Sequence, residues 1–371
     1  IRAAVSAKEA YESYIETLRL DPTLIDAERG VGVLKTIIGA TPSAYRRFIR
    51  MFGYSGSIDE GIRLLDHVIQ KGRYAREESA LFLSLTRVFL NIDRDEGIAV
   101  LAQKFEATED PVTGLVYAFS LRMARRPEAS VDVAERAIRT MKSPGYTDVE
   151  FLYYHLGSAL FSLNRFEEAA AAYRSYIETF DGQSYQASSR LRLGLCLEML
   201  GRRTEAEVWY AQVEAPTDFD LDQAAQREAR RRLKNPLTDA DKVLLRGENA
   251  ISAGQYNEAI AILEKVFFSD AESQLDRTEA AYLLGRAHHL LKEWDEAATK
   301  YVYARTHPVS KNVRWAPWST YYLGRVRAET DHPDEARRLF QEAIDFKGKY
   351  DYKKSLQRSA KLALEKLDAE R

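Results

Sequence analysis

Apolar residues recur at helical spacing in two adjacent stretches between Glu150 and Asp181. The positions that share a face are Tyr153, Leu156, Gly157 and Leu160 in the first stretch and Phe166, Ala169, Ala170, Tyr173 and Ile177 in the second. Gly157 and Ala169 are small enough to let two helices approach closely, with Tyr173 filling the space beside them. The pattern therefore predicts an antiparallel helical hairpin with its turn at residues 163–165.

The same pattern returns four times toward the C-terminus. Each copy has a glycine, an alanine twelve residues later and a large residue four beyond that: Gly194, Ala206 and Tyr210; Gly247, Ala259 and Leu263; Gly285, Ala297 and Tyr301; Gly324, Ala336 and Phe340. Successive glycines are 37, 53, 38 and 39 residues apart, against roughly 34 for the tetratricopeptide repeat, which this pattern resembles. The resemblance implies an all-α fold, a right-handed superhelical solenoid of tetratricopeptide-like helix hairpins. A C-terminal capping helix is expected over residues 352–367, which are apolar on one side.

The N-terminal part carries degenerate versions of this unit. We expect helices over residues 7–22, 24–38, 42–52, 57–70 and 95–104, and a hairpin over 111–141 whose second helix begins at Pro127. Ser57 is the predicted N-cap of its helix, with Glu60 completing a capping box and Gly61 at the small-residue position. The chain begins at Ile1 rather than Met, so we interpret it as processed or trimmed, with any targeting segment or partner of the first helix removed.

Two further segments resemble the eukaryotic tetratricopeptide repeat protein thirty-nine family and the related inclusion body clearance protein. The residues that match are Phe52, Gly53, Gly56, Asp59, Glu60, Gly61 and Leu65, and then Tyr352, Arg358, Ala363, Leu364 and Leu367. Ser57 departs from the family, which often has Gly or Asp there, and the long insertions of its eukaryotic members are absent. The resemblance implies an adaptor role and carries no catalytic residue across.

The repeats are interrupted between Gln212 and Thr238. Residues 217–233 read as one extra helix, with acids in its first turn and Arg230, Arg231 and Arg232 in its last turn. We favour a solvated helix end over an RNA or phosphate patch, because nearby acids offset the arginines. The predicted domains are an N-terminal array 1–214 (degenerate repeats 1–142, clear repeats 148–214), a linking helix 215–235, and C-terminal repeats with the capping helix 236–371.

Composition narrows the possible functions. With 54 Lys plus Arg against 56 Asp plus Glu, no overall charge attracts the chain to nucleic acid. No apolar run is long enough to span a membrane. The single cysteine, Cys196, lacks a CxxC partner and is expected in the core. His288 and His289 are adjacent and therefore face different sides of a helix, which argues against a shared metal. The predictions are therefore no enzyme, no cofactor and no metal, with oligomeric state and compartment left open (cytoplasmic, or exported with its targeting segment removed).

What remains is the concave face, which first helices line in stacked hairpins. The predicted partner-binding residues are Tyr154, Tyr282, Arg286, His289, Trp318, Tyr321 and Arg325. Tyrosine and arginine contribute disproportionately at interfaces, so this surface suits an extended peptide, although plain packing between helices also explains the tyrosines. We predict a non-catalytic scaffold or adaptor that binds a peptide or protein in its groove. The alternatives are a small-ligand-binding or enzyme-accessory repeat protein that uses the concave cavity, and weak nucleic-acid association through Arg227–Lys234.

Overall fold

The computed structural model describes residues 2–41, 46, 49–51, 53–146, 148–217, 219–307, 309–310 and 312–369. The helix predicted over residues 42–52 falls largely outside these residues. The described part is all-α, as predicted, and divides into two compact units, Ile1–Ala124 and Arg125–Arg371. The predicted linking helix, residues 215–235, lies inside the second unit.

The first unit is a series of helical pairs. Its helices are α1 (Arg2–Leu20), the short 3-10 helix η1 (Ile25–Ala27), α2 (Glu28–Ala40), α4 (Ile58–Lys71), α5 (Arg76–Leu90), α6 (Arg94–Thr108) and α7 (Pro111–Met123). Ser57 caps α4 as predicted, its hydroxyl accepting the Glu60 backbone N–H at 3.1 Å. The predicted capping box is not completed, because the Glu60 carboxylate pairs with Lys35 Nζ at 2.6 Å instead.

Glycines bring the backbones of this unit into close approach. A Cβ on Gly61 would lie 2.0 Å from Thr36 Oγ1 and 2.7 Å from the Gly32 carbonyl oxygen. These are distances that no real Cβ tolerates. The helices α2 and α4 therefore meet backbone to backbone at Gly32 and Gly61, the position that the sequence pattern singled out.

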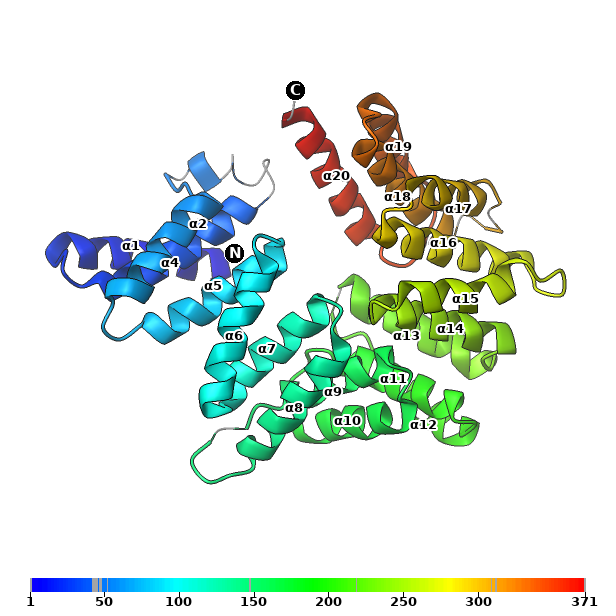
Figure 1. Ribbon diagram of the computed structural model, residues 1–371, viewed down its shortest axis with the longest axis horizontal. Helices are drawn as coiled ribbons and strands as arrows, with labels where there is room; N and C mark the ends of the chain where they lie inside the picture. Colours follow the sequence, from blue (N-terminus) through cyan, green and yellow to red (C-terminus); the bar gives the residue numbers. More distant parts are fainter. Residues whose placement is uncertain are drawn as a thin grey trace. The chain divides into compact units, whose positions relative to one another are not determined.

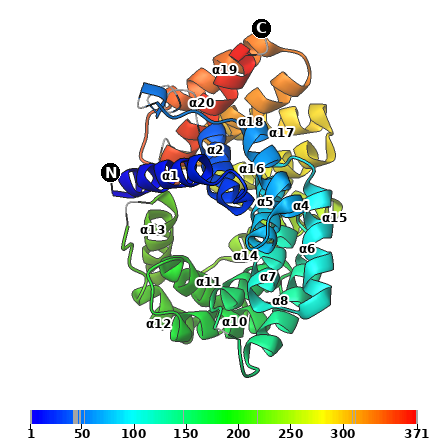
Figure 2. The same cartoon turned by 90° about the vertical axis from the view of Figure 1, so that its left-hand side faces the viewer.

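The second unit contains the five clear repeats and the extra helix (Figures 1 and 2). Its helices are α8 (Pro127–Met141), α9 (Phe151–Ser162), α10 (Phe166–Thr179), α11 (Gln186–Met199), α12 (Arg203–Ala211), α13 (Asp220–Lys234), α14 (Asp239–Ser252), α15 (Tyr256–Phe267), α16 (Gln274–Leu291), α17 (Trp294–Thr306), α18 (Trp315–Glu329), α19 (Pro333–Asp345) and α20 (Lys353–Ala369). Each predicted hairpin turn falls between the two helices of a pair.

The glycine of each repeat lies against the large side chain predicted to fill the space beside it. A Cβ on Gly157 would lie 3.0 Å from the Tyr173 ring, and one on Gly285 would lie 2.6 Å from the Tyr301 ring. Tyr173 and Tyr301 are fully buried. The same contact recurs at Gly194 with Tyr210, Gly247 with Leu263 and Gly324 with Phe340. Each repeat of the second unit therefore closes its hairpin by packing one large side chain against one glycine.

The helix α20 covers the end of this array, as predicted for a cap. Leu356 and Ala360 are fully buried in a cluster with Phe340 and Tyr350. Ala363, Leu364 and Leu367 pack partly buried at the edge of the same cluster. One side of α20 thus completes the core that α19 would otherwise leave open.

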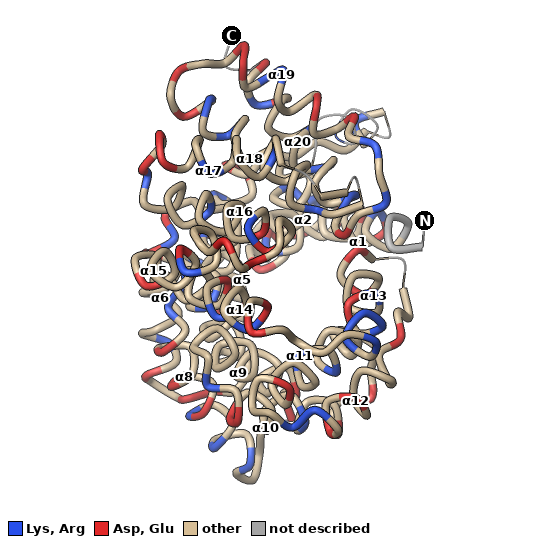
Figure 3. The backbone as a smooth tube through the Cα atoms, turned by 90° about the vertical axis from the view of Figure 1, so that its right-hand side faces the viewer, with Lys and Arg blue, Asp and Glu red and all other residues tan. Residues whose placement is uncertain are grey.

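The extra helix α13 exposes Arg230 and Arg231 at its end, as expected, but buries Arg232. Arg232 is 5% exposed, and its guanidinium bonds Glu228 at 2.7 Å and Asp241 at 2.9 Å. Arg231 also pairs with Glu228, at 2.9 Å. Figure 3 shows acidic and basic residues side by side along this helix. The sequence placed Arg232 in solvent because Asp241, its second partner, lies on the next helix.

Candidate functional site

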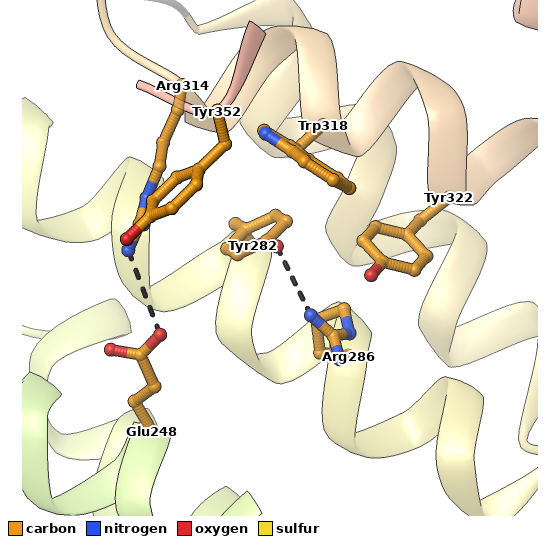
Figure 4. A pocket seen from close by; sticks show the side chains of 7 residues that line it. All are labelled: Glu248, Tyr282, Arg286, Arg314, Trp318, Tyr322 and Tyr352. Carbon is orange, nitrogen blue, oxygen red and sulfur yellow. Dashed lines mark hydrogen bonds and ion pairs between the residues drawn. The ribbon is translucent and has the colours of Figure 1, made fainter. Parts of the chain in front are cut away.

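A cavity of about 250 Å³ lies within the second unit, where α14, α16, α18 and the start of α20 face one another (Figure 4). Its lining residues are Glu248, Tyr282, Arg286, Arg314, Trp318, Tyr322 and Tyr352. Three of these, Tyr282, Arg286 and Trp318, belong to the predicted binding surface. Arg314, Tyr322 and Tyr352 were not predicted.

Helical spacing brings four of the lining residues together. Tyr282 and Arg286 are one turn apart on α16, and Arg286 Nη1 donates to the Tyr282 hydroxyl at 3.3 Å. Trp318 and Tyr322 are one turn apart on α18, and their rings stack with centroids 5.9 Å apart. The Arg286 guanidinium lies over the Tyr322 ring, 4.5 Å from its centroid. The two helices therefore meet in a cation–π contact at the cavity wall.

Arg286 has no carboxylate within ion-pair distance among the residues that the structure describes; its interactions are those with Tyr282 and Tyr322. The Tyr282 ring is 7% exposed, and burial raises the pKa of its phenol to about 12, with the Arg286 charge partly offsetting the rise. The phenol is thus neutral and can accept the arginine hydrogen bond. Because only Arg286 Nη1 bonds Tyr282, the other N–H groups of this guanidinium are left to donate to an incoming anion.

The other arginine of the cavity is already paired. Arg314 Nη2 lies 3.7 Å from Glu248 Oε1, and its guanidinium lies 4.2 Å from the Trp315 ring and 5.4 Å from the Tyr352 ring. Since the charges of Arg314 and Glu248 offset each other, the lining carries one uncompensated positive charge, that of Arg286.

Tyr352 reaches the cavity because the start of α20 is held to α13. Arg227 Nε bonds Asp351 Oδ1 at 2.5 Å, and Asp220 Oδ2 accepts both the backbone N–H (2.8 Å) and the hydroxyl (3.1 Å) of Ser355. Tyr352 itself has a φ of 61°, the left-handed region that few residues other than glycine adopt. Together these contacts turn its ring toward Arg314 (Figure 4).

A polar group on the cavity wall remains without a partner. Trp318 Nε1 is buried and makes no hydrogen bond in the described part of the chain. His289 packs edge-on against Tyr322 with ring centroids 6.0 Å apart, and burial lowers the pKa of its imidazole to about 4. His289 is thus neutral at physiological pH and supports the wall.

The remaining predicted residues are placed differently. Tyr154 is 6% exposed and stacks on Tyr185 with centroids 4.4 Å apart, and Tyr321 is 8% exposed and packs on Phe340. Both tyrosines stand three residues before the glycine of their repeat. They serve mainly to pack helices together, which was the alternative explanation for the predicted tyrosines. Arg325 is exposed, unlike Arg286 at the equivalent place in the preceding repeat.

The cysteine and the adjacent histidines have structural surroundings. Cys196 is fully buried, and burial raises the pKa of its thiol. His288 contacts Glu293, whereas His289 contacts Trp294, so the adjacent histidines face different neighbours as predicted. Among the described residues, no group of three or more His, Cys, Asp or Glu side chains is placed to hold a metal ion. No described helix has both the length and the apolar character needed to cross a membrane.

Two stretches of the sequence match a known repeat family. Residues 154–220 and 244–310 match the sequence model of the tetratricopeptide repeat. No curated protein matches the sequence significantly.

Three solved structures illustrate the likeness in fold. NprR in complex with its cognate peptide NprX is 14% identical, with a TM-score of 0.35 over 98% of this chain and 84% of that chain. The tetratricopeptide repeat domain of P58(IPK) is 12% identical, with a TM-score of 0.27 over 100% and 96%. Yeast Tom70 is 11% identical, with a TM-score of 0.31 over 99% and 86%. Because these scores are low, the assignment depends on the repeat match and on the repeated hairpins: this chain is a helical repeat protein whose residues 154–220 and 244–310 match tetratricopeptide repeats.

Proposed function

We propose that the second unit is a non-catalytic binding scaffold whose cavity receives an acidic group of a peptide or protein segment. The observation that carries the proposal is Arg286, a guanidinium set in an aromatic wall with no carboxylate partner among the residues that the structure describes. The acidic group would pair with Arg286, and the rings of Tyr282, Trp318, Tyr322 and Tyr352 would cover the apolar atoms next to it. Arg325, exposed on the following repeat, would contact the segment outside the cavity.

Charge decides what kind of group the cavity takes. Four aromatic rings around a hollow also suit a quaternary or primary ammonium ion. Here Arg286 is uncompensated, so a cation would meet net repulsion, whereas a carboxylate would meet a ready bidentate donor. We therefore favour an anion.

Size decides between a segment and a whole small ligand. Pockets for drug-sized molecules measure roughly 300–1,000 Å³, and this cavity measures about 250 Å³. That volume fits one acidic side chain or one chain end better than a complete cofactor. A small carboxylate-bearing ligand is the second candidate, favoured by the paired polar groups Glu248 and Arg314 on the lining.

The proposed surface is narrower than the predicted one. Tyr282, Arg286 and Trp318 form its centre, His289 and Tyr321 support it from behind, and Arg325 extends it. Tyr154 is left out because its burial against Tyr185 leaves little ring surface for a partner. We also propose that the chain is related to the tetratricopeptide repeat protein thirty-nine family, and that its repeats follow the right-handed superhelix of tetratricopeptide arrays.

A displayed library of random twelve-residue peptides tests the proposal. Selection on the purified protein should enrich sequences containing Asp or Glu, and synthetic versions should bind in fluorescence anisotropy. Arg286→Gln should weaken binding at least about fivefold, since truncating a central interface arginine costs about 1–4 kcal/mol. Arg338→Gln, an exposed arginine on α19, is the matched control and should change the affinity by less than twofold.

The result also separates the two candidate functions. Enrichment of neutral or basic peptides, or unchanged affinity of the Arg286→Gln variant, would show that the cavity does not receive an acidic segment. If no peptide binds but free glutarate shifts the melting temperature of the parent and not of the Arg286→Gln variant, the small-ligand alternative is correct.

A further inference from the structure

The cavity lining holds a second cation besides Arg286. Arg314 stands immediately before α18, which begins at Trp315 and has no acidic residue in its first turn. The partial positive charge at the start of that helix therefore adds to the charge of the guanidinium. Without a partner, Arg314 would attract an anion to this corner of the cavity just as Arg286 does to its own.

The carboxylate of Glu248 already occupies this corner. Its Oε1 lies 3.7 Å from Arg314 Nη2, and no other described carboxylate lies within ion-pair distance of that guanidinium. Figure 4 shows Glu248 directed toward Arg314, whereas Arg286 is directed toward the Tyr282 hydroxyl. Since 3.7 Å is too long for a hydrogen bond, charge holds the pair together. Glu248 thus lies where an incoming anion would otherwise meet Arg314.

The repeat pattern does not require an acid at this position. Glu248 follows the glycine of its repeat by one residue, and the equivalent residues of the other clear repeats are Ser158, Leu195, Arg286 and Arg325. None of these four is acidic. Because the other hairpins close without a carboxylate here, the packing of the repeat does not explain Glu248.

Glu248 sets the net charge of the cavity lining. The charged residues of the lining are Glu248, Arg286 and Arg314, so one positive charge is left over. A ligand group with one negative charge neutralises it. A group with two negative charges would leave an excess negative charge that Glu248 repels. If Glu248 were neutral, the lining would carry two positive charges and would match a dianion instead.

We propose that Glu248 is a specificity-determining residue, which restricts the cavity to a group with a single negative charge by pairing with Arg314. This inference rests on the proposed function and narrows its ligand class. The favoured group is the carboxylate of one aspartate or glutamate side chain. Dicarboxylates and phosphorylated residues are disfavoured, because their second charge finds Arg314 already paired.

A purely structural role for the pair gives a different expectation. Glu248 lies on α14 and Arg314 at the start of α18, so the pair joins two helices, and its loss would lower the free energy of unfolding. Such a loss would weaken the binding of every peptide to a similar degree. The ratio of affinities for two peptides that differ only in charge therefore separates the two roles.

The probes are three labelled versions of the tightest-binding acidic peptide from the library selection, measured by fluorescence anisotropy. They carry glutamate, γ-carboxyglutamate or phosphoserine at the acidic position that contributes most to binding. The γ-carboxyglutamate side chain keeps the length of glutamate and adds one carboxylate. Phosphoserine has a charge of about −1.5 to −2 at pH 7 and gives an independent dianion.

The variants alter one or both members of the pair. Glu248→Gln removes the charge and keeps the shape, and Glu248→Ser introduces the residue type that Ser158 has at the equivalent position. The double variant Glu248→Gln/Arg314→Gln tests whether the second charge of the ligand is received by Arg314. Glu258→Gln, which removes an exposed carboxylate from α15, is the matched control.

The parent and Glu258→Gln should bind the two doubly charged peptides no more than twofold more tightly than the glutamate peptide. Glu248→Gln and Glu248→Ser should prefer the doubly charged peptides at least tenfold, and the double variant should lose that preference.

Two results would overturn this inference. They are a parent that already prefers doubly charged peptides tenfold, and a preference that stays at the parent's value in both Glu248 variants. Either result leaves the proposed function intact where Arg286→Gln still weakens binding of the glutamate peptide. If no acidic peptide binds the parent, the proposed function and this inference fail together.

Discussion

The two compact units close their helical hairpins in different ways. Between α2 and α4 of the first unit glycine lets backbone meet backbone, as at Gly61 against the Gly32 carbonyl, although Gly30 receives the Tyr14 ring; in the second unit the glycine of each clear repeat receives a large side chain, as Gly157 does from Tyr173. The first arrangement leaves few side chains that mark the repeat. The second requires an alanine and a large residue at fixed offsets, which is why the match to the tetratricopeptide repeat falls within the second unit.

If large side chains carry the stability of the second unit, removing one from its end should have the largest effect. Leu356 is fully buried in the cap, so Leu356→Ala should lower the free energy of unfolding by about 2–5 kcal/mol. Hydrogen exchange of the amides of α18, α19 and α20 measures this locally. Leu362→Ala, on the same helix at 41% exposure, is the control and should cost less than about 1 kcal/mol. Equal protection in both variants would mean that α20 is not a cap.

Adding one methyl group at a glycine of each unit tests this difference in packing. In Gly61→Ala the new Cβ meets Thr36 and the Gly32 backbone, which cannot move without shifting α2, so we expect a loss of about 3 kcal/mol. In Gly157→Ala the Tyr173 ring yields by a few tenths of an ångström, and the gain in helix propensity of about 1 kcal/mol offsets much of the cost. Urea unfolding followed by hydrogen exchange compares the two. A larger loss at Gly157 than at Gly61 would reverse the contrast.

A smaller effect is expected from a partly buried acid of the second unit. Burial, with repulsion from Glu248 and Asp241, raises the pKa of Glu279 to about 8, and Arg314 and Arg231 only partly offset the rise. The folded protein then holds a proton that the unfolded chain has released, so stability should fall as the pH rises from about 5 to 8. Glu279→Gln should flatten this part of the pH profile of thermal unfolding, and exposed Glu258→Gln should not. If stability still fell with pH in Glu279→Gln as in the parent, the Glu279 carboxylate would have an ordinary pKa and lie in solvent.

The hairpins could be predicted from the sequence because apolar and small residues recur along the chain with the period of an α-helix. It located Tyr282, Arg286 and Trp318 for the same reason, since they keep a fixed register to the glycines. It missed Arg314 and Tyr352, which precede their helices. Tyr352 reaches the cavity through contacts of α20 with α13, among them those between Asp220 and Ser355, 135 residues apart. It also treated Arg286 and Arg325 as equivalent. Their exposure differs because Tyr322 of the next repeat covers Arg286.

The central claim is that Arg286 pairs with an acidic residue of a bound segment. A double-mutant cycle tests it most directly, with titration calorimetry on the parent and Arg286→Gln against the best selected peptide and its Glu→Gln counterpart. A direct charge pair should give a coupling energy of at least about 1.5 kcal/mol, the lower end of the values measured for close interfacial pairs. A coupling below about 0.3 kcal/mol, with both single changes weakening binding, would contradict the pairing and leave Arg286 as a support for the aromatic wall.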